Sequence, residues 1–254
     1  MHIVIVCIFV FFAGFVDSIA GGGGLISLPA YFFIGLPTLN ACATNKFSAA
    51  AGTTFATIKF SRSKALDWSV ALIAAVASFG FSYFASSIAL RLNEDVLKLI
   101  IVIFLPIVAL FLFLKKDFGA NGTEKPEEKN FKMYALAFFI GMIIGFYDGL
   151  IGPGTGTFAI IGFSTFMHYD LLHASGNAKV LNLASNYASA IRFLMDGKVI
   201  LSIAVPAALC GIAGNWLGST LAIKKGNSFI KIIMLAVMII LFVKMILDIS
   251  AISK

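Results

Sequence analysis

Residues 3–36, IVIVCIFVFFAGFVDSIAGGGGLISLPAYFFIGL, hold the pattern from which the rest of the fold follows. An apolar run at 3–20 ends in four glycines, and a shorter apolar run continues at 24–36. A transmembrane helix needs about 20 predominantly apolar residues to cross the bilayer core. Further runs of that length lie at 67–90, 95–114 and 229–248. The sequence therefore predicts an all-α, polytopic transmembrane bundle with helices broken by glycine.

The composition also favours a chain embedded in a lipid bilayer. Hydrophobic residues make up 60% of the 254 residues, charged residues only 12%, and the mean hydropathy is +0.99. Soluble domains are about one-half apolar and one-quarter charged. The net charge of +7 lies on lysines and arginines between the apolar runs, which is typical of the positive-inside rule rather than of nucleic-acid binding. The first apolar run lacks a preceding basic region, so we interpret it as a retained helix rather than a signal peptide.

The chain contains an internal repeat, which is common among transporters. GFVD at 14–17 recurs as GFYD at 145–148, and after a two-residue insertion Lys46 falls on Lys179. One register shift followed by continued matching predicts two tandem, pseudo-symmetric repeats. The predicted regions are a first transmembrane repeat at 1–114, a polar cytoplasmic linker at 115–132 and a second transmembrane repeat at 133–254.

The number of membrane crossings depends on the short run after each glycine break. If this run turns back, each half crosses an odd number of times and the two halves are inverted. If it continues a broken helix, each half crosses four times and the halves are parallel. Across both layouts the bundle has about eight to ten membrane segments. Lysine and arginine counts do not separate the two layouts. The inverted one is favoured because it is common in transporters whose site lies at broken helices.

Two glycine breaks at matched positions are the first candidate binding elements. Glycines in a membrane segment free backbone N–H and C=O groups, which are tolerated there only beside protein or a polar cavity. A helix that begins after such a break directs N–H donors and its positive dipole end at that cavity, which suits an anion. The alternative is a tight turn or a close helix crossing. The candidate residues are Gly21, Gly22, Gly23 and Gly24 in the first half and Gly152, Gly154 and Thr155 in the second.

The third apolar segment of each half carries the polar candidates. In the second half Lys179, Asn182 and Asn186 share one helical face, and in the first half Lys46 follows Thr44 and Asn45. Such a face is costly against lipid and is expected to look inward, where the lysines would neutralise an anionic substrate. The alternatives are hydrogen bonding between helices for the asparagines and snorkelling to the interface for the lysines.

Asp17 and Asp148 precede the two glycine breaks at equivalent positions. Each carboxylate could pair with a lysine, cap a neighbouring helix or exchange protons during transport. The structural roles are favoured, because an ionised carboxylate beside an anion site would repel the substrate. His168 and His173 lack the spacing of helical metal ligands, and no Walker-type motif is present, so neither a metal nor a cofactor is predicted.

At these residues the sequence resembles the TauE/SafE family of sulfite-exporter-like permeases. The resemblance lies in GGGGLISLP at 21–29, LNACATNKFSAAAGTTFA at 39–56 and a degenerate second copy from Gly145 to Asn186. It implies a secondary carrier that moves sulfite, sulfonates and related anions, driven by the proton-motive force. The family motif falls on Gly21, Gly23, Gly24, Pro29, Thr44, Asn45 and Lys46. The second copy departs from it, with Pro153 in place of a glycine.

These observations predict a transporter of small anions in the bacterial inner membrane that works by alternating access. Its expected partners are the anionic substrate and the bilayer, with a homodimer as one option for its assembly. A passive anion channel is the main alternative, because it would use the same residues. A membrane-embedded enzyme is the other, and it would need a nucleophile–base pair or a metal cluster that the sequence does not display.

Overall fold

The computed structural model describes residues 2–97, 99, 122–123 and 130–252, with side chains as far as residue 237. Every named element in this part of the chain is a helix, which confirms the predicted all-α class. The elements are α1 (His2–Ala20), α2 (Gly24–Phe33), α3 (Thr38–Arg62), α4 (Trp68–Ala89), α6 (Phe131–Leu150), α7 (Thr155–Phe166), α8 (Leu171–Met195) and α9 (Leu201–Ile252). Among them α1, α4, α6 and the Leu201–Val237 part of α9 are long and apolar enough to cross a membrane.

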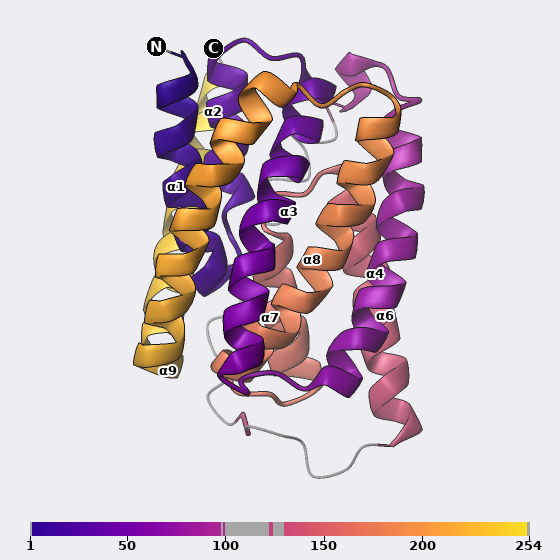
Figure 1. The fold of residues 1–254 in the computed structure, drawn as a ribbon, viewed down its shortest axis with the longest axis vertical. Coiled ribbons are helices and arrows are strands. Elements are labelled where there is room, and N and C mark those ends of the chain that lie inside the picture. The colour runs from indigo at the N-terminus through magenta and orange to yellow at the C-terminus, as the bar shows by residue number, and fades with distance from the viewer. Residues whose placement is uncertain (1, 98, 100–121, 124–129, 253–254) are drawn as a thin grey trace.

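The short helices α2 and α7 each form a hairpin with the helix before them. Figure 1 shows α1 running from the N-terminal end of the bundle toward its middle and α2 returning to that end. Helices α6 and α7 do the same from the opposite end, and α3 and α8 run in opposite directions. Gly21 and Gly152 have φ angles of +79° and +86°, which glycine adopts at little cost, so the chain can reverse there. These helix directions are those of the inverted layout.

The first helix of each hairpin packs along a helix of the other half of the chain, α1 along α9 and α6 along α4. Small residues permit the close approach. A Cβ atom on Gly145 would lie 2.5 Å from the Ser78 Cα, and Gly141 lies against the backbone of Ala74. Helices in lipid associate through such van der Waals contact, since the hydrophobic effect adds little between them. The two halves are therefore interleaved rather than side by side.

The last helix, α9, contains a reversal at Gly226, where φ is 67° and ψ is −157°. Figure 1 shows the chain turning back there, so that the C-terminal part ends beside the N-terminus. The predicted linker at 115–132 lies mostly outside the described residues. Helix α6 begins at Phe131, where the Asn130 side chain accepts a hydrogen bond from Met133 N at 3.0 Å and caps the helix.

Candidate functional site

The two glycine breaks touch each other in the interior of the bundle. Thr157 N donates to Gly21 O at 3.3 Å, and Thr157 Oγ1 donates to Ala20 O at 2.8 Å. A Cβ atom on Gly156 would lie 2.5 Å from the Gly21 Cα, so only glycine permits this approach. The end of α1 is thus bonded directly to the first turn of α7. Backbone groups freed by the first break find partners in the second half of the chain.

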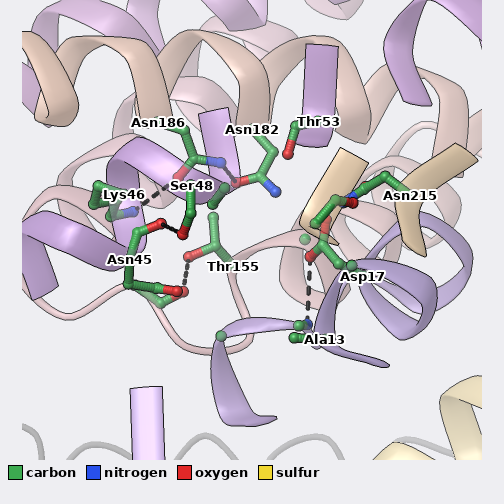
Figure 2. Close-up of a pocket in the computed structure, with 18 of the residues that line it drawn as sticks. Ala13, Asp17, Asn45, Lys46, Ser48, Thr53, Thr155, Asn182, Asn186 and Asn215 are labelled. Carbon is green, nitrogen blue, oxygen red and sulfur yellow. Dashed lines mark hydrogen bonds between the residues drawn. The ribbon is translucent and has the colours of Figure 1, made fainter. Parts of the chain in front are cut away.

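A cavity of about 50 Å3 opens beside this contact and is formed by both halves (Figure 2). The first residues of α2 and α7 line it, so the positive dipole ends of both short helices lie at one space. The predicted site residues that line the cavity are Asp17, Gly21, Gly23, Gly24, Asn45, Lys46, Asp148, Gly152, Thr155, Asn182 and Asn186.

Four predicted site residues lie outside the cavity lining. Gly22 packs against Val237, where an added Cβ would lie 2.6 Å from Cγ1. Thr44 Oγ1 accepts a hydrogen bond from Ile200 N at 3.2 Å, and Gly154 is the left-handed residue that precedes α7, with φ of 85°. Lys179 is fully buried and points to Asp17. Gly22, Thr44 and Gly154 therefore shape the backbone around the cavity but do not form the surface of the cavity.

Two ion pairs join the halves of the chain. Lys46 Nζ lies 2.5 Å from Asp148 Oδ1, and Lys179 Nζ lies 2.9 Å from Asp17 Oδ2. The lysine of each half therefore pairs with the aspartate of the other half. The two pairs join equivalent positions of the predicted repeat. The Lys179 ammonium group also donates to the Asp17 carbonyl, so both of its hydrogen bonds within the described part of the chain go to one residue. Removing one partner of a buried pair costs about 3–5 kcal/mol, because the other charge is left uncompensated.

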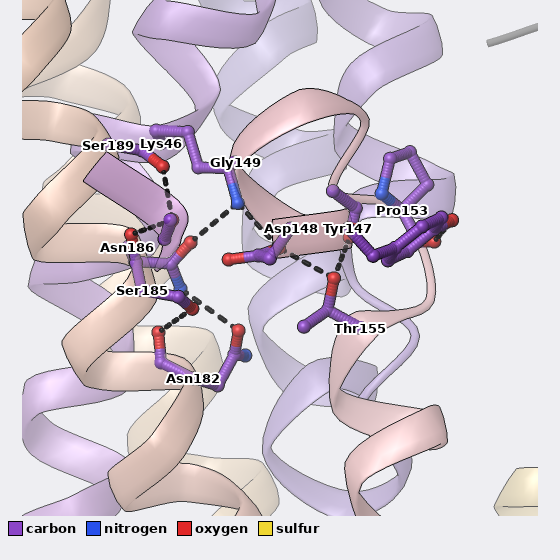
Figure 3. Close-up of polar contacts among 12 residues, drawn as sticks. Lys46, Tyr147, Asp148, Gly149, Pro153, Thr155, Asn182, Ser185, Asn186 and Ser189 are labelled. Carbon is purple, nitrogen blue, oxygen red and sulfur yellow. Dashed lines mark hydrogen bonds and ion pairs between the residues drawn. The ribbon is translucent and has the colours of Figure 1, made fainter. Parts of the chain in front are cut away.

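The Lys46 pair belongs to a wider polar network, drawn in Figure 3. Lys46 Nζ donates to Asn186 Oδ1 at 3.3 Å, and Asn186 Nδ2 donates to Asn182 Oδ1 at 3.4 Å. Thr155 Oγ1 donates to Asp148 Oδ1 at 2.6 Å from the first turn of α7. This network connects α3, α6, α7 and α8. A change in the charge of Lys46 or Asp148 would therefore alter contacts among helices of both halves.

The Asp17 pair sits at the other side of the cavity. Gly23 N, at the start of α2, donates to Asp17 Oδ1 at 3.4 Å. Asp17 thus joins the end of α1, the start of α2 and the middle of α8 through one carboxylate. Its side chain is 15% exposed, whereas the Asp148 side chain is 2% exposed. Asp148 Oδ2 has no hydrogen-bond partner among the described residues.

Sequence reasoning missed Asn215, which lines the cavity from α9. Its Nδ2 donates to Gly211 O at 3.0 Å, one turn earlier in the same helix. The signal was available, because an asparagine inside an apolar span is costly in lipid and is a default pointer to function. Ser48 and Thr53 of α3 also line the cavity without having been singled out as site residues.

Comparison with known proteins places the chain among bacterial transporters. The family described as "Sulfite exporter TauE/SafE" matches residues 6–245. The probable membrane transporter protein YfcA of Escherichia coli strain K12 is 34% identical over 238 residues, 93% of this chain and 86% of that protein. The probable membrane transporter protein ORF9 of a Sinorhizobium species is 33% identical, over 94% and 90%. One from Haemophilus influenzae is 30% identical, over 94% and 92%. No solved structure matches the chain.

Proposed function

Because the chain belongs to the TauE/SafE family of membrane transporters, we propose that it is a secondary active transporter of small sulfur oxyanions such as sulfite and sulfonates. One observation carries the proposal: the positive ends of α2 and α7 and the ammonium group of Lys46 converge on one buried cavity. Backbone N–H groups, helix dipoles and an ammonium group are the features that bind oxyanions in proteins. Asn45, Asn182 and Asn186 add further polar groups around the same space.

Alternating access follows from the arrangement of the hairpins. The α1–α2 hairpin enters from one end of the bundle and the α6–α7 hairpin from the other, and the cavity lies where they meet (Figure 1). In transporters with inverted repeats, the substrate site lies at broken helices near the membrane midplane, and one unit moves against the other around it. We propose the same relation here, with 1–114 and 133–254 as the two units. Movement of one hairpin would open the cavity to one side at a time.

Proton coupling follows from the charges at the site. Two lysines and two aspartates balance, so a bound monoanion would leave one uncompensated negative charge. Burial of such a charge is strongly unfavourable unless it is compensated. A proton taken up by Asp148 or Asp17 would restore the balance and release a lysine for the substrate. Anion and proton would then cross together, which lets the proton-motive force drive transport.

The distribution of basic residues supports an orientation in the bacterial inner membrane. Among the described residues, the larger group of lysines and arginines lies at the C-terminal end of α3, the start of α6 and the reversal of α9, and the smaller group lies near the C-terminal ends of α4 and α8. Figure 1 shows these two sets of helix ends at opposite ends of the bundle, the second at the end that holds the N-terminus. Basic residues accumulate on the cytoplasmic side of membrane proteins. The N-terminus would then face the periplasm. The larger group is Lys59, Arg62, Lys64, Lys132, Lys224 and Lys225, and the smaller one is Arg91, Arg192 and Lys198.

Reconstitution into liposomes tests the proposed function. With radiolabelled sulfite at equal concentration on both sides, an imposed proton gradient should drive net uptake until the internal concentration exceeds the external one, and the rate of uptake should saturate with sulfite concentration. A passive channel would give only downhill flux that the proton gradient does not reverse. Empty liposomes and the Lys46→Met variant serve as controls. The absence of any sulfite or sulfonate flux above that of empty liposomes would refute the proposal.

A further inference from the structure

We propose that Asn215 contacts the substrate and accepts a hydrogen bond from it. The site would then select small monoanions that carry an O–H or N–H donor. Dianions and donor-free anions of similar size would bind less well. This inference rests on the proposed function, because it concerns the ligand of the same cavity. It adds a residue from α9 to a site otherwise predicted from the glycine breaks and the polar faces of α3 and α8.

The amide of Asn215 is held in one orientation. Nδ2 donates to Gly211 O at 3.0 Å and lies beside Gly14 and Gly52, the positions at which α1 and α3 approach α9. A Cβ atom on Gly14 would lie 2.7 Å from this nitrogen, so the glycines make room for the amide. A reversed amide would set Oδ1 against the Gly211 carbonyl oxygen, which repels it. The hydrogen-bond partner therefore assigns Nδ2 to Gly211 and leaves Oδ1 without a partner in the same helix.

The oxygen of this amide is unsatisfied within the protein. Asn215 is only 3% exposed, and its Oδ1 has no hydrogen-bond partner among the described residues. Most buried polar atoms in proteins are paired, and an unpaired one loses its hydration without compensation. Figure 2 shows the side chain reaching from α9 toward the part of the cavity that Asp17 lines. A donor on the bound ligand would supply the missing partner.

The cavity thus has two chemically different sides. At one side Lys46 and the first turn of α7 offer positive charge and donors, whereas at the other side Asp17 and the Asn215 oxygen offer acceptors. A ligand with an anionic group and a separate donor satisfies both sides. The balance of two lysines and two aspartates adds a charge limit, because the cost of burying an ion rises with the square of its charge. A monoanion is therefore preferred to a dianion.

Equilibrium binding to the purified full-length protein tests this selectivity. The probes are 2-hydroxyethanesulfonate and 1-propanesulfonate, which have the same charge and the same number of heavy atoms but differ in the hydroxyl donor. Sulfate serves as the dianion. The hydroxylated sulfonate should bind roughly 5- to 100-fold more tightly than propanesulfonate, the range expected when a buried acceptor is left unpaired. Sulfate should bind more weakly than the hydroxylated sulfonate.

Two substitutions assign the preference to Asn215. In Asn215→Ala the ratio of the two sulfonate affinities should fall to within about twofold, because the acceptor is gone. Asn215→Ser is the second variant, since a serine can bond the carbonyl one turn earlier, as Ser219 Oγ does to Asn215 O at 2.6 Å. This variant removes the amide oxygen that would accept from the ligand, but it keeps a side-chain donor for Gly211 O. Ser219→Ala is the matched control at a buried position of the same helix, outside the cavity lining, and should retain the wild-type ratio.

Each outcome bears on one of the two proposals. Equal affinity of the wild type for both sulfonates, or a ratio that persists in the folded Asn215 variants, would overturn the role of Asn215 and leave anion transport standing. Tight binding of sulfate would overturn the charge limit. If no sulfonate and no sulfite binds with saturation, the proposed function itself fails. Should Asn215→Ala not fold, the serine variant decides the result alone.

Discussion

Replacement of Lys46 by methionine separates its role in binding from its role in stability. The substitution keeps most of the side-chain volume but removes the ammonium group that lies 2.5 Å from Asp148 Oδ1 and 3.3 Å from Asn186 Oδ1. Breaking a buried ion pair costs about 3–5 kcal/mol. A lost charge-assisted hydrogen bond to the ligand is worth about 1.5–3 kcal/mol, or roughly a ten- to hundredfold loss of affinity. Lys46→Met should therefore lower both the melting temperature and the affinity for sulfite.

Adding Asp148→Asn to Lys46→Met gives a double variant. Its second substitution removes the Asp148 carboxylate that the first one leaves uncompensated. The double variant should regain most of the lost melting temperature, because no unpaired charge is then buried, but it should not regain affinity. Lys179→Met is the comparison, since Lys179 bonds Asp17 and does not line the cavity. It should lower stability more than it lowers affinity. Melting temperature and sulfite binding, measured on all four proteins, give the answer. Wild-type affinity in the double variant would refute a role for Lys46 in holding the anion.

Three further predictions concern packing and orientation. Gly145→Ala should lower the melting temperature by several degrees, because its Cβ would lie 2.5 Å from the Ser78 Cα, whereas Gly80→Ala has open space within 4 Å and should be neutral or slightly stabilising. Gly156→Ala should abolish sulfite uptake in liposomes, because its Cβ would separate the two glycine breaks. In a background without native cysteines, Lys64→Cys should react with impermeant thiol reagents only from the cytoplasm and Lys198→Cys only from the periplasm. The reverse labelling pattern would contradict the proposed orientation.

The helices were largely predictable because lipid forces every spanning backbone group to bond within its own segment. The apolar run at 3–20 corresponds to α1 (His2–Ala20), and 67–90 to α4 (Trp68–Ala89). The third segment of each half was recognised by its polar face, but its start was not, and the structure begins α3 at Thr38 and α8 at Leu171. The Asp170 side chain accepts from His173 N at 2.8 Å and caps α8 there. The start of α8 is too polar to be recognised as part of a membrane segment from its hydropathy.

The pairing of charges at the site could not be predicted from spacing alone. The sequence indicated that Lys46, Lys179, Asp17 and Asp148 lie near the breaks, but the helical period gives only the face on which each residue lies. Which lysine meets which aspartate depends on the way the two hairpins enter from opposite ends. The polarity of Asn215 within an apolar span was visible in the sequence, but its place at the cavity was not, because α9 reaches the cavity only through packing against α1 and α3.

We propose that a small oxyanion binds in the cavity between the starts of α2 and α7. Selenite has the shape of sulfite and scatters anomalously, so crystals of the protein soaked in selenite locate the anion directly. We expect an anomalous difference peak in the cavity, beside the first turns of both short helices and placed so that an oxygen of the anion lies about 3 Å from Lys46 Nζ. A peak elsewhere, with none in the cavity of a protein that transports sulfite, would contradict it.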